Sequence, residues 1–146
     1  MNPGALSIPA VFDCNVIVSA IGWGGNPRAY LALVAAGQVR LCLTPENWEE
    51  YDLRVPEVLA DKKPGTNARP MLDLILQASH FVDAVPLGKP RSRDLKDDRY
   101  VAAALGAGAK FIVTSDRDLL VLEKPFGVQI VTPIKFLQRV RSTSGF

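Results

Sequence analysis

Short apolar runs alternate along the chain with longer segments whose apolar residues recur at helical spacing. The short runs predict strands at residues 8–12, 39–43, 81–85, 110–113 and 128–131. The longer segments predict helices between them, at residues 16–21, 30–36, 45–55, 70–79 and 97–105, and a last helix from residue 133. Because helices joining strands place those strands in parallel, we expect a three-layer α/β/α fold with a central parallel sheet.

Proline and glycine residues mark the expected ends of the helices. Asn26-Pro27 and Thr44-Pro45 each combine an N-cap residue with a proline in the first helical turn. Pro56 is expected to interrupt or restart the helix that begins at residue 45, because proline cannot donate to the helical backbone. The glycines expected to end helices are Gly37, Gly106 and Gly108.

Apolar spacing also predicts which faces of two helices are buried. In the helix that follows Thr44, one face carries Trp48, Tyr51 and Val55. In the last helix the expected inward residues are Ile134, Leu137 and Val140, with Lys135 and Arg139 turned outward. The polar segment 61–67 is the predicted surface loop between helices.

The composition is that of an ordinary globular protein. The chain has 146 residues, 48% of them apolar, which fits a single domain spanning residues 1–146. No apolar run approaches the roughly 18 residues that a membrane span needs, and no export signal is recognised. Cys14 and Cys42 lie in or beside strand-like runs, so we expect reduced core thiols and a cytoplasmic protein.

Acidic side chains stand at four well-separated points, at Asp13, Glu50, Asp97 and Asp116. Asp13 and Asp116 directly follow predicted strands, and the carboxyl ends of parallel strands meet at one edge of a sheet. Two carboxylates about 4 Å apart repel by roughly 4 kcal/mol at an effective dielectric of 20, so a cation must balance such a cluster. With one histidine and two cysteines in the chain, the oxygen ligands favour Mg²⁺ or Mn²⁺ over zinc.

Such a site is suited to the hydrolysis of a phosphodiester bond. Asp13, Asp97 and Asp116 would hold one or two ions, with Glu50 binding directly or through water. Each acid also has a plain structural interpretation, since aspartates after strands often cap helices and glutamates on helices are often solvated. The sequence leaves Glu49 and Glu50 nearly equal as the second acid.

Basic residues suggest where a polyanionic substrate would bind. Lys89, Arg91 and Arg93 directly precede the third acidic cluster and are the predicted RNA-binding residues. Two further basic groups comprise Lys62, Lys63 and Arg69, and Lys135, Arg139 and Arg141. Any of these groups can also be a solvated face, and the net charge of +2 neither requires nor excludes a nucleic acid.

Four motifs together resemble those of PIN-domain nucleases, most closely the compact bacterial branch of toxins from toxin–antitoxin pairs. They are the segment from Phe12 to Ala20, Glu50-Tyr51, the cluster from Asp94 to Asp98, and the segment from Ile112 to Leu120. The resemblance spans nearly the whole chain. Its joint order and spacing are specific, although each motif alone is weak.

This resemblance assigns roles to individual residues. Asp13, Glu50, Asp97 and Asp116 match the four acids that bind metal and catalyse cleavage. Supporting residues implied by the same motifs are Asn15, Thr114, Ser115, Asp118 and Asp94, with Asp94 and Asp98 as alternatives to Asp97. Cys14 departs from the family, which usually has threonine there, and a thiol is the poorer hydrogen-bond partner.

The resemblance implies a Mg²⁺- or Mn²⁺-dependent endoribonuclease, the toxin of a type II pair. Its expected partners are an RNA substrate, a small antitoxin protein that covers the acidic cleft, and a second copy in a homodimer. One alternative is a catalytically inactive module of the same fold that binds RNA or protein. Another is a haloacid-dehalogenase-like phosphatase, which needs a second aspartate where this chain has Asn15.

Overall fold

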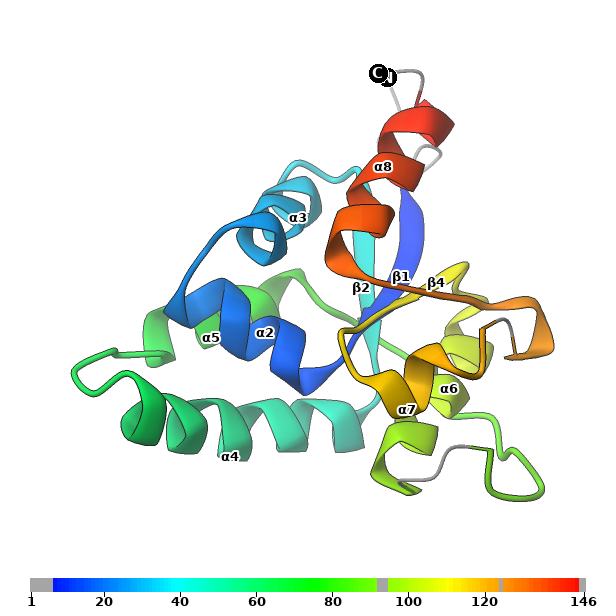
Figure 1. Ribbon diagram of the computed structural model, residues 1–146, viewed down its shortest axis with the longest axis horizontal. Helices are drawn as coiled ribbons and strands as arrows, with labels where there is room; N and C mark the ends of the chain where they lie inside the picture. Colours follow the sequence, from blue (N-terminus) through cyan, green and yellow to red (C-terminus); the bar gives the residue numbers. More distant parts are fainter. Residues whose placement is uncertain (1–6, 92–94, 124, 145–146) are drawn as a thin grey trace.

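A five-stranded parallel sheet forms the centre of the molecule, with helices on both faces (Figure 1). The computed structural model describes residues 7–91, 95–123 and 125–144. The sheet order is β3-β2-β1-β4-β5, which confirms the three-layer α/β/α expectation. The strands are β1 (Ile8–Phe12), β2 (Val39–Leu43), β3 (His80–Phe81), β4 (Phe111–Val113) and β5 (Gln129–Val131).

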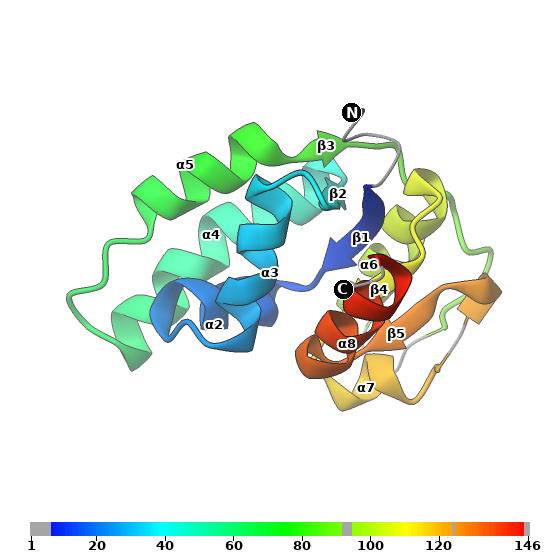
Figure 2. The same ribbon diagram turned by 90° about the horizontal axis from the view of Figure 1, so that it is seen from above.

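The helices alternate with these strands along the chain. They are α2 (Cys14–Gly22), α3 (Asn26–Ala35), α4 (Pro45–Lys62), α5 (Arg69–Ala78), α6 (Leu95–Ala107), α7 (Arg117–Leu120) and α8 (Pro133–Ser144), with a 3₁₀ turn, η1 (Pro125–Gly127), before β5. Helix α6 packs on β2, β1 and β4, whereas α3 and α8 pack together on the opposite face (Figure 2). Helices α2, α4 and α7 begin where β1, β2 and β4 end, at the lower edge of the sheet in Figure 1.

Strand β1 lies in the middle and pairs in parallel with β2 and β4. Its register places Ala10 beside Leu41 on one side and beside Phe111 on the other. The predicted strands at 8–12 and 39–43 are confirmed at both ends.

The strand predicted at 81–85 is wrong beyond its start. Pairing with β2 continues only through the Val82 N–H, which donates to the carbonyl oxygen of Leu43 at 2.9 Å. The chain then turns along α6, where the Val85 N–H donates to the carbonyl oxygen of Ala102 at 3.0 Å. The prediction that Gly106 ends a helix is wrong, since α6 continues to Ala107. Gly106 instead allows close packing, because a Cβ there would come within 1.7 Å of the carbonyl oxygen of Asp83.

Three expectations for helix ends and faces are also corrected. Pro56 lies inside an unbroken α4, on its exposed face, so the predicted interruption is wrong. Helix α3 begins at Asn26 after a Gly25 cap with φ of 71°, a conformation natural to glycine, so Asn26 is not the cap. In α8, Ile134 is 55% exposed and Phe136 points inward in its place.

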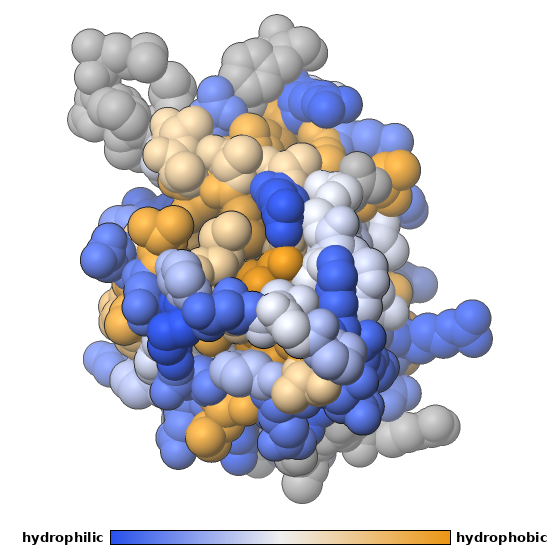
Figure 3. Space-filling model, turned by 90° about the vertical axis from the view of Figure 1, so that its left-hand side faces the viewer, coloured by the Kyte–Doolittle hydropathy of each residue, from blue (hydrophilic) through white to orange (hydrophobic). Residues whose placement is uncertain are grey.

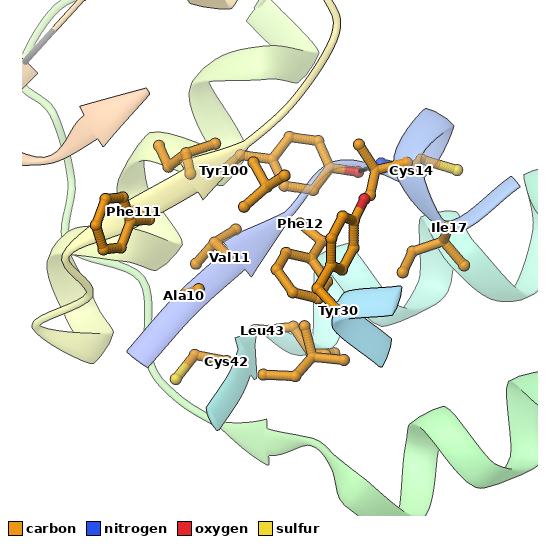
Figure 4. Packing of buried hydrophobic residues seen from close by; sticks show 14 of the residues in the cluster. Ala10, Val11, Phe12, Cys14, Ile17, Tyr30, Cys42, Leu43, Tyr100 and Phe111 are labelled. Atoms are coloured by element: carbon orange, nitrogen blue, oxygen red, sulfur yellow. Dashed lines mark hydrogen bonds between the residues drawn. The ribbon is translucent and has the colours of Figure 1, made fainter. Parts of the chain in front are cut away.

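Phe136 belongs to an aromatic cluster that anchors the end of β1. Its ring contacts those of Phe12, Tyr30 and Phe111, with centroids 5.4–5.8 Å apart, and Phe12 and Tyr30 are 4.6 Å apart. Figure 4 shows Phe12 and Tyr30 side by side, with Tyr100 reaching the chain just beyond Phe12. The Phe12 carbonyl oxygen accepts a hydrogen bond from the Tyr51 hydroxyl. The residue that follows Phe12 is therefore held firmly at the carboxyl edge.

Strand β5 forms one outer edge of the sheet. The Ile130 N–H on its open side donates to the carbonyl oxygen of Glu123 at 3.0 Å, from the segment that follows α7.

Cys14 and Cys42 are buried free thiols, as expected from their apolar surroundings. Among the described residues, no helix combines the length and apolar character needed to cross a membrane.

Candidate metal site and catalytic centre

Asp13 lies in the turn between β1 and α2 and is almost fully buried, with 3% of its surface exposed. Its N–H donates to the carbonyl oxygen of Val113 at 3.2 Å, which continues the pairing of β1 with β4. Its Oδ1 accepts from the Val16 N–H at 2.9 Å, so Asp13 also caps α2. The fold thus fixes both the backbone and the carboxylate of this residue.

The loop after β4 reaches the same place from the neighbouring strand. The Thr114 N–H donates to the carbonyl oxygen of Val131 at 2.9 Å, and its hydroxyl donates to Oδ2 of Asp13. The Asp116 N–H donates to Oγ1 of Thr114 at 2.9 Å. Asp116 caps α7, because its Oδ1 accepts from the Asp118 N–H at 2.9 Å.

Three carboxylates come close enough to share a metal ion. Asp97 from the first turn of α6, Asp116 before α7 and Asp118 within it each offer an oxygen, and these oxygens lie within 4.8 Å of one another. Asp97 is buried, with 8% of its surface exposed. An all-oxygen group of this kind fits a hard divalent cation such as Mg²⁺ or Mn²⁺. Asp118, expected only in a supporting role, belongs to this group, whereas Asp13 lies outside it.

Glu50 approaches from α4 and is held by a tyrosine on α6. The Tyr100 hydroxyl donates to Oε1 of Glu50 and accepts from the Cys14 N–H at 3.1 Å. Tyr100 therefore connects the start of α2 with the carboxylate of Glu50. Glu49 lines only a neighbouring groove, so the geometry separates the two glutamates that the sequence left nearly equal.

These side chains enclose a small polar cavity with a volume of about 150 Å³. Its lining residues are Asp13, Cys14, Asn15, Glu50, Arg54, Asp97, Tyr100 and Asp116. A polar cavity of this size has room for several water molecules. All four of the predicted catalytic acids therefore line one cavity, although they come from four separate parts of the chain.

Burial raises the pKa of Asp13 from 3.8 to about 6. The hydrogen bonds from Thr114 and Val16 lower this pKa, whereas the nearby charges of Asp116 and Glu50 raise it further. In the described lining of the cavity, four carboxylates stand against one arginine, Arg54, so acidic groups are in excess there. The electrostatics of the cavity are therefore those of a site built for a cation.

The other buried groups around the cavity stay neutral. Burial, with the charges of Glu50 and Asp13, raises the pKa of the Cys14 thiol to about 12, although nearby Arg54 opposes this rise. Burial raises the pKa of Tyr100 and of Tyr51 far above the ordinary range, and the charge of Glu50 adds to both shifts. Cys14 is thus not an activated nucleophile, and Tyr100 remains a hydroxyl donor to Glu50.

The remaining predicted site residues take different positions. Asn15 lines the cavity, Thr114 is fully buried and Ser115 is exposed. Asp98 accepts from the Arg91 N–H at 3.0 Å and is not part of the three-carboxylate group. Asp94 and Arg93 lie outside the described residues.

The two described residues of the predicted RNA-binding group differ in their surroundings. Lys89 is exposed beside a shallow groove. Arg91 is partly buried, donates from Nη2 to the carbonyl oxygen of Leu87 at 3.3 Å, and lies over the ring of Phe126 at 4.8 Å. The guanidinium of Arg91 is therefore engaged in contacts within the protein.

Sequence reasoning missed two residues that line the cavity. Tyr100 stands three positions after Asp97 on α6, and Arg54 stands four positions after Glu50 on α4. Both spacings put a side chain on the same helix face as the predicted acid. A search at these spacings from each acid would have found them.

Comparison with known proteins agrees with this fold. The protein-family model described as "PIN domain" matches residues 9–118 of the sequence. The crystal structure of PAE2754 from Pyrobaculum aerophilum is similar, with a TM-score of 0.61 at 15% identity, covering 92% of this chain and 90% of that chain. At this identity the likeness concerns the fold alone. No curated protein was found to match the chain.

Proposed function

Because the chain belongs to the PIN domain family, we propose that it is a metal-dependent endoribonuclease that hydrolyses phosphodiester bonds in RNA. Its fold is of the nuclease type and carries an acidic cluster suited to a metal ion. The observation that carries the proposal is the meeting of Asp97, Asp116 and Asp118 within 4.8 Å, with Asp97 and Asp116 lining the same cavity as Asp13 and Glu50.

The proposed ligands are Asp97, Asp116 and Asp118, with Asp13 and Glu50 binding directly or through water. A bound Mg²⁺ or Mn²⁺ ion supplies a water of lowered pKa and polarises the phosphate to be cleaved. Glu50, which accepts a hydrogen bond from the Tyr100 hydroxyl, would accept another from the attacking water. Thr114 holds the Asp13 carboxylate in one orientation, so the site is formed before the substrate arrives.

We further propose that the protein acts in the cytoplasm as the toxin of a type II toxin–antitoxin pair. A cavity with four acids would attract a basic segment of a small antitoxin protein, which would block the metal site. A homodimer is part of the same proposal. Apolar residues reach the surface in the upper half of Figure 3, on the side where α3 lies, and Trp23 is 55% exposed.

The inactive-module alternative keeps the same cavity but predicts no turnover. The phosphatase alternative has little support, because Asn15 stands where that class needs its second aspartate and the chain is a PIN domain.

A cleavage assay tests the proposal. Purified protein is incubated with structured and single-stranded RNA in Mg²⁺, in Mn²⁺ and in EDTA, beside the variants Asp116→Asn and Asp61→Asn. Asp61 is an exposed residue near the end of α4 and serves as the matched control. We expect metal-dependent cleavage by the wild type and Asp61→Asn, and none by Asp116→Asn. Equal cleavage by all three would indicate contamination, and binding without cleavage would favour the inactive module.

A further inference from the structure

We propose that Arg54 forms a phosphate-binding subsite beside the acidic cavity, which holds the RNA backbone phosphate next to the one that is cleaved. This inference rests on the proposed function and names the route by which the substrate reaches the site. It assigns to Arg54 a positioning role, distinct from that of the residues proposed to bind the metal.

Arg54 stands one helical turn after Glu50 on α4, and its side chain is exposed. It lines the acidic cavity and also a second groove of about 430 Å³. Glu50 is the other residue that borders both. The two spaces therefore adjoin along this turn of α4, and a strand of RNA lying in the groove would pass Arg54 before it reaches Asp13, Asp97 and Asp116. The groove also carries Glu46 and Glu49, so the RNA backbone needs a cation there as well as at the cavity.

Arg54 is the cationic residue of the acidic cavity, as far as its described lining shows. The groove contains a second arginine, Arg99, whose Nε lies 3.5 Å from Oε2 of Glu46. By contrast, no ion pair within 4 Å involves Arg54 among residues 7–91, 95–123 and 125–144. A hydrogen bond links Arg54 to the Cys14 side chain, but a guanidinium has five N–H donors, so its charge and its remaining donors are available to a ligand.

The charges of the cavity explain why such a cation is needed. A phosphodiester backbone that approaches Asp13, Glu50, Asp97 and Asp116 meets four carboxylates, and one divalent ion offsets only part of that charge. A guanidinium binds two phosphate oxygens at once with charge-assisted hydrogen bonds. Arg54 would therefore favour the binding of RNA at the rim while leaving the metal ligands undisturbed.

The competing interpretation is a surface pair with Glu50, four positions earlier on the helix. Such pairs contribute little to helix stability and have no effect on substrate binding. Loss of Arg54 changes only the stability of the protein if the residue is a helix pair, whereas it weakens RNA binding if the residue is a phosphate subsite.

The variants are Arg54→Gln and Arg54→Lys, with Lys110→Gln as the charge-matched control at an exposed residue directly before β4, at the end of the sheet away from the acids. Steady-state cleavage of a labelled single-stranded RNA in Mg²⁺ gives kcat and KM. Binding of the same RNA, measured by fluorescence anisotropy over a range of salt concentrations, uses each variant combined with Asp116→Asn to prevent cleavage. Thermal melting of each variant monitors folding.

We expect Arg54→Gln to raise KM and Kd by about tenfold, with little change in kcat. The slope of log Kd against log salt should fall by about 0.7–1, the value for one phosphate contact. Arg54→Lys should keep that slope but raise KM severalfold, because it retains the charge and loses the two-pronged contact. Lys110→Gln should match the wild type.

Unchanged KM, Kd and salt slope in Arg54→Gln would overturn the subsite and leave only the helix pair. A fall in kcat with unchanged KM would overturn it as well. If Arg54→Gln does not fold, the KM of Arg54→Lys tests the proposal instead. An unchanged KM in that variant would contradict a bidentate contact between Arg54 and the phosphate. If the wild type cleaves no RNA, the proposed nuclease function fails, and the anisotropy data still test phosphate binding by Arg54.

Discussion

Thr114 donates a hydrogen bond from its hydroxyl to the Asp13 carboxylate, although the two residues are 101 positions apart. The same hydroxyl oxygen accepts from the Asp116 N–H at 2.9 Å. One buried side chain therefore joins the ends of β1 and β4 and sets the positions of two acids at once.

Replacing Thr114 by valine should remove both hydrogen bonds while keeping the shape of the side chain. The Asp13 carboxylate would lose a donor that lowers its pKa, and the Asp116 N–H would lose its acceptor. We expect Thr114→Val to destabilise the fold by about 1–3 kcal/mol and to weaken Mn²⁺ binding, measured by urea unfolding and calorimetry. Thr114→Ser, which keeps the hydroxyl, should match the wild type in stability and in Mn²⁺ binding. Equal losses in Thr114→Val and Thr114→Ser would contradict the role of the Thr114 hydroxyl.

The raised pKa of Asp13 predicts how stability changes with pH in the metal-free protein. Between pH 3.8 and about 6 the folded state retains a proton that the unfolded chain has released, so this residue lowers stability as the pH rises through that range. The total loss is about 3 kcal/mol and is complete above pH 6. Urea unfolding in EDTA should show that Asp13→Asn is the more stable protein at pH 7.5 and loses its advantage at pH 4. If the free energies of unfolding of the wild type and Asp13→Asn changed in parallel with pH, the raised pKa would not belong to Asp13.

Tyr100 and Tyr51 offer a matched pair of hydroxyl deletions. Tyr100→Phe leaves the Cys14 N–H without its acceptor and Glu50 without its donor, whereas Tyr51→Phe removes the donor to the Phe12 carbonyl oxygen. Each should cost about 1–3 kcal/mol in urea unfolding. Only Tyr100→Phe should also lower kcat for RNA cleavage, because of these two hydroxyls it is the Tyr100 hydroxyl that donates to the Glu50 carboxylate. If both variants lost activity equally, the contact with Glu50 would not be the reason.

The three-carboxylate group predicts which acids govern metal affinity. Asp97→Asn and Asp118→Asn each remove a charged oxygen from the group and should weaken Mn²⁺ binding by about tenfold or more, as measured by calorimetry. Asp98→Asn changes a neighbouring residue outside the group and should bind Mn²⁺ nearly as well as the wild type. If Asp98→Asn weakened Mn²⁺ binding more than Asp118→Asn, then Asp98 rather than Asp118 would belong to the metal-binding group.

Gly106 and Gly108 predict opposite sensitivities to alanine. A Cβ at Gly106 would lie 1.7 Å from the carbonyl oxygen of Asp83, so α6 and the chain beside it must separate. Gly108 has φ of 61°, and nothing lies within 4 Å of the point that an alanine methyl group would occupy, so alanine there costs only backbone strain of about 1–2 kcal/mol. The melting temperature of Gly106→Ala should therefore be well below that of Gly108→Ala. The reverse order would contradict the close packing of Gly106 against Asp83.

Strand positions near the sheet centre could be predicted from the sequence because their apolar runs end at polar turn residues. The run Ile8–Phe12 is followed by Asp13, and the run Val39–Leu43 is followed by Thr44. The observed strands have the same bounds as these runs. The segment after Phe81 has a similar apolar pattern. Its path depends on the packing of Asp83 against Gly106, a contact between distant parts of the chain that local pattern does not contain.

The candidate site was predictable to the extent that it depends on strand ends. Asp13 and Asp116 follow adjacent parallel strands, so their meeting is a consequence of topology. The contributions of Tyr100 and Arg54 depend on where long side chains on α6 and α4 point, which spacing alone limits but does not determine. The inward turn of Phe136 in place of Ile134 has the same cause, because the phase of a helix is set by what it packs against.

The hydrogen bond from the Ile130 N–H to the Glu123 carbonyl has a consequence for assembly. The rim strand of a sheet commonly offers unpaired donors that can recruit a strand from another molecule and begin fibrous growth. At β5 the protein's own chain already occupies such a donor. Ribbon-like stacking through that rim is thereby discouraged, and at the opposite rim β3 offers only His80 and Phe81 to an incoming strand.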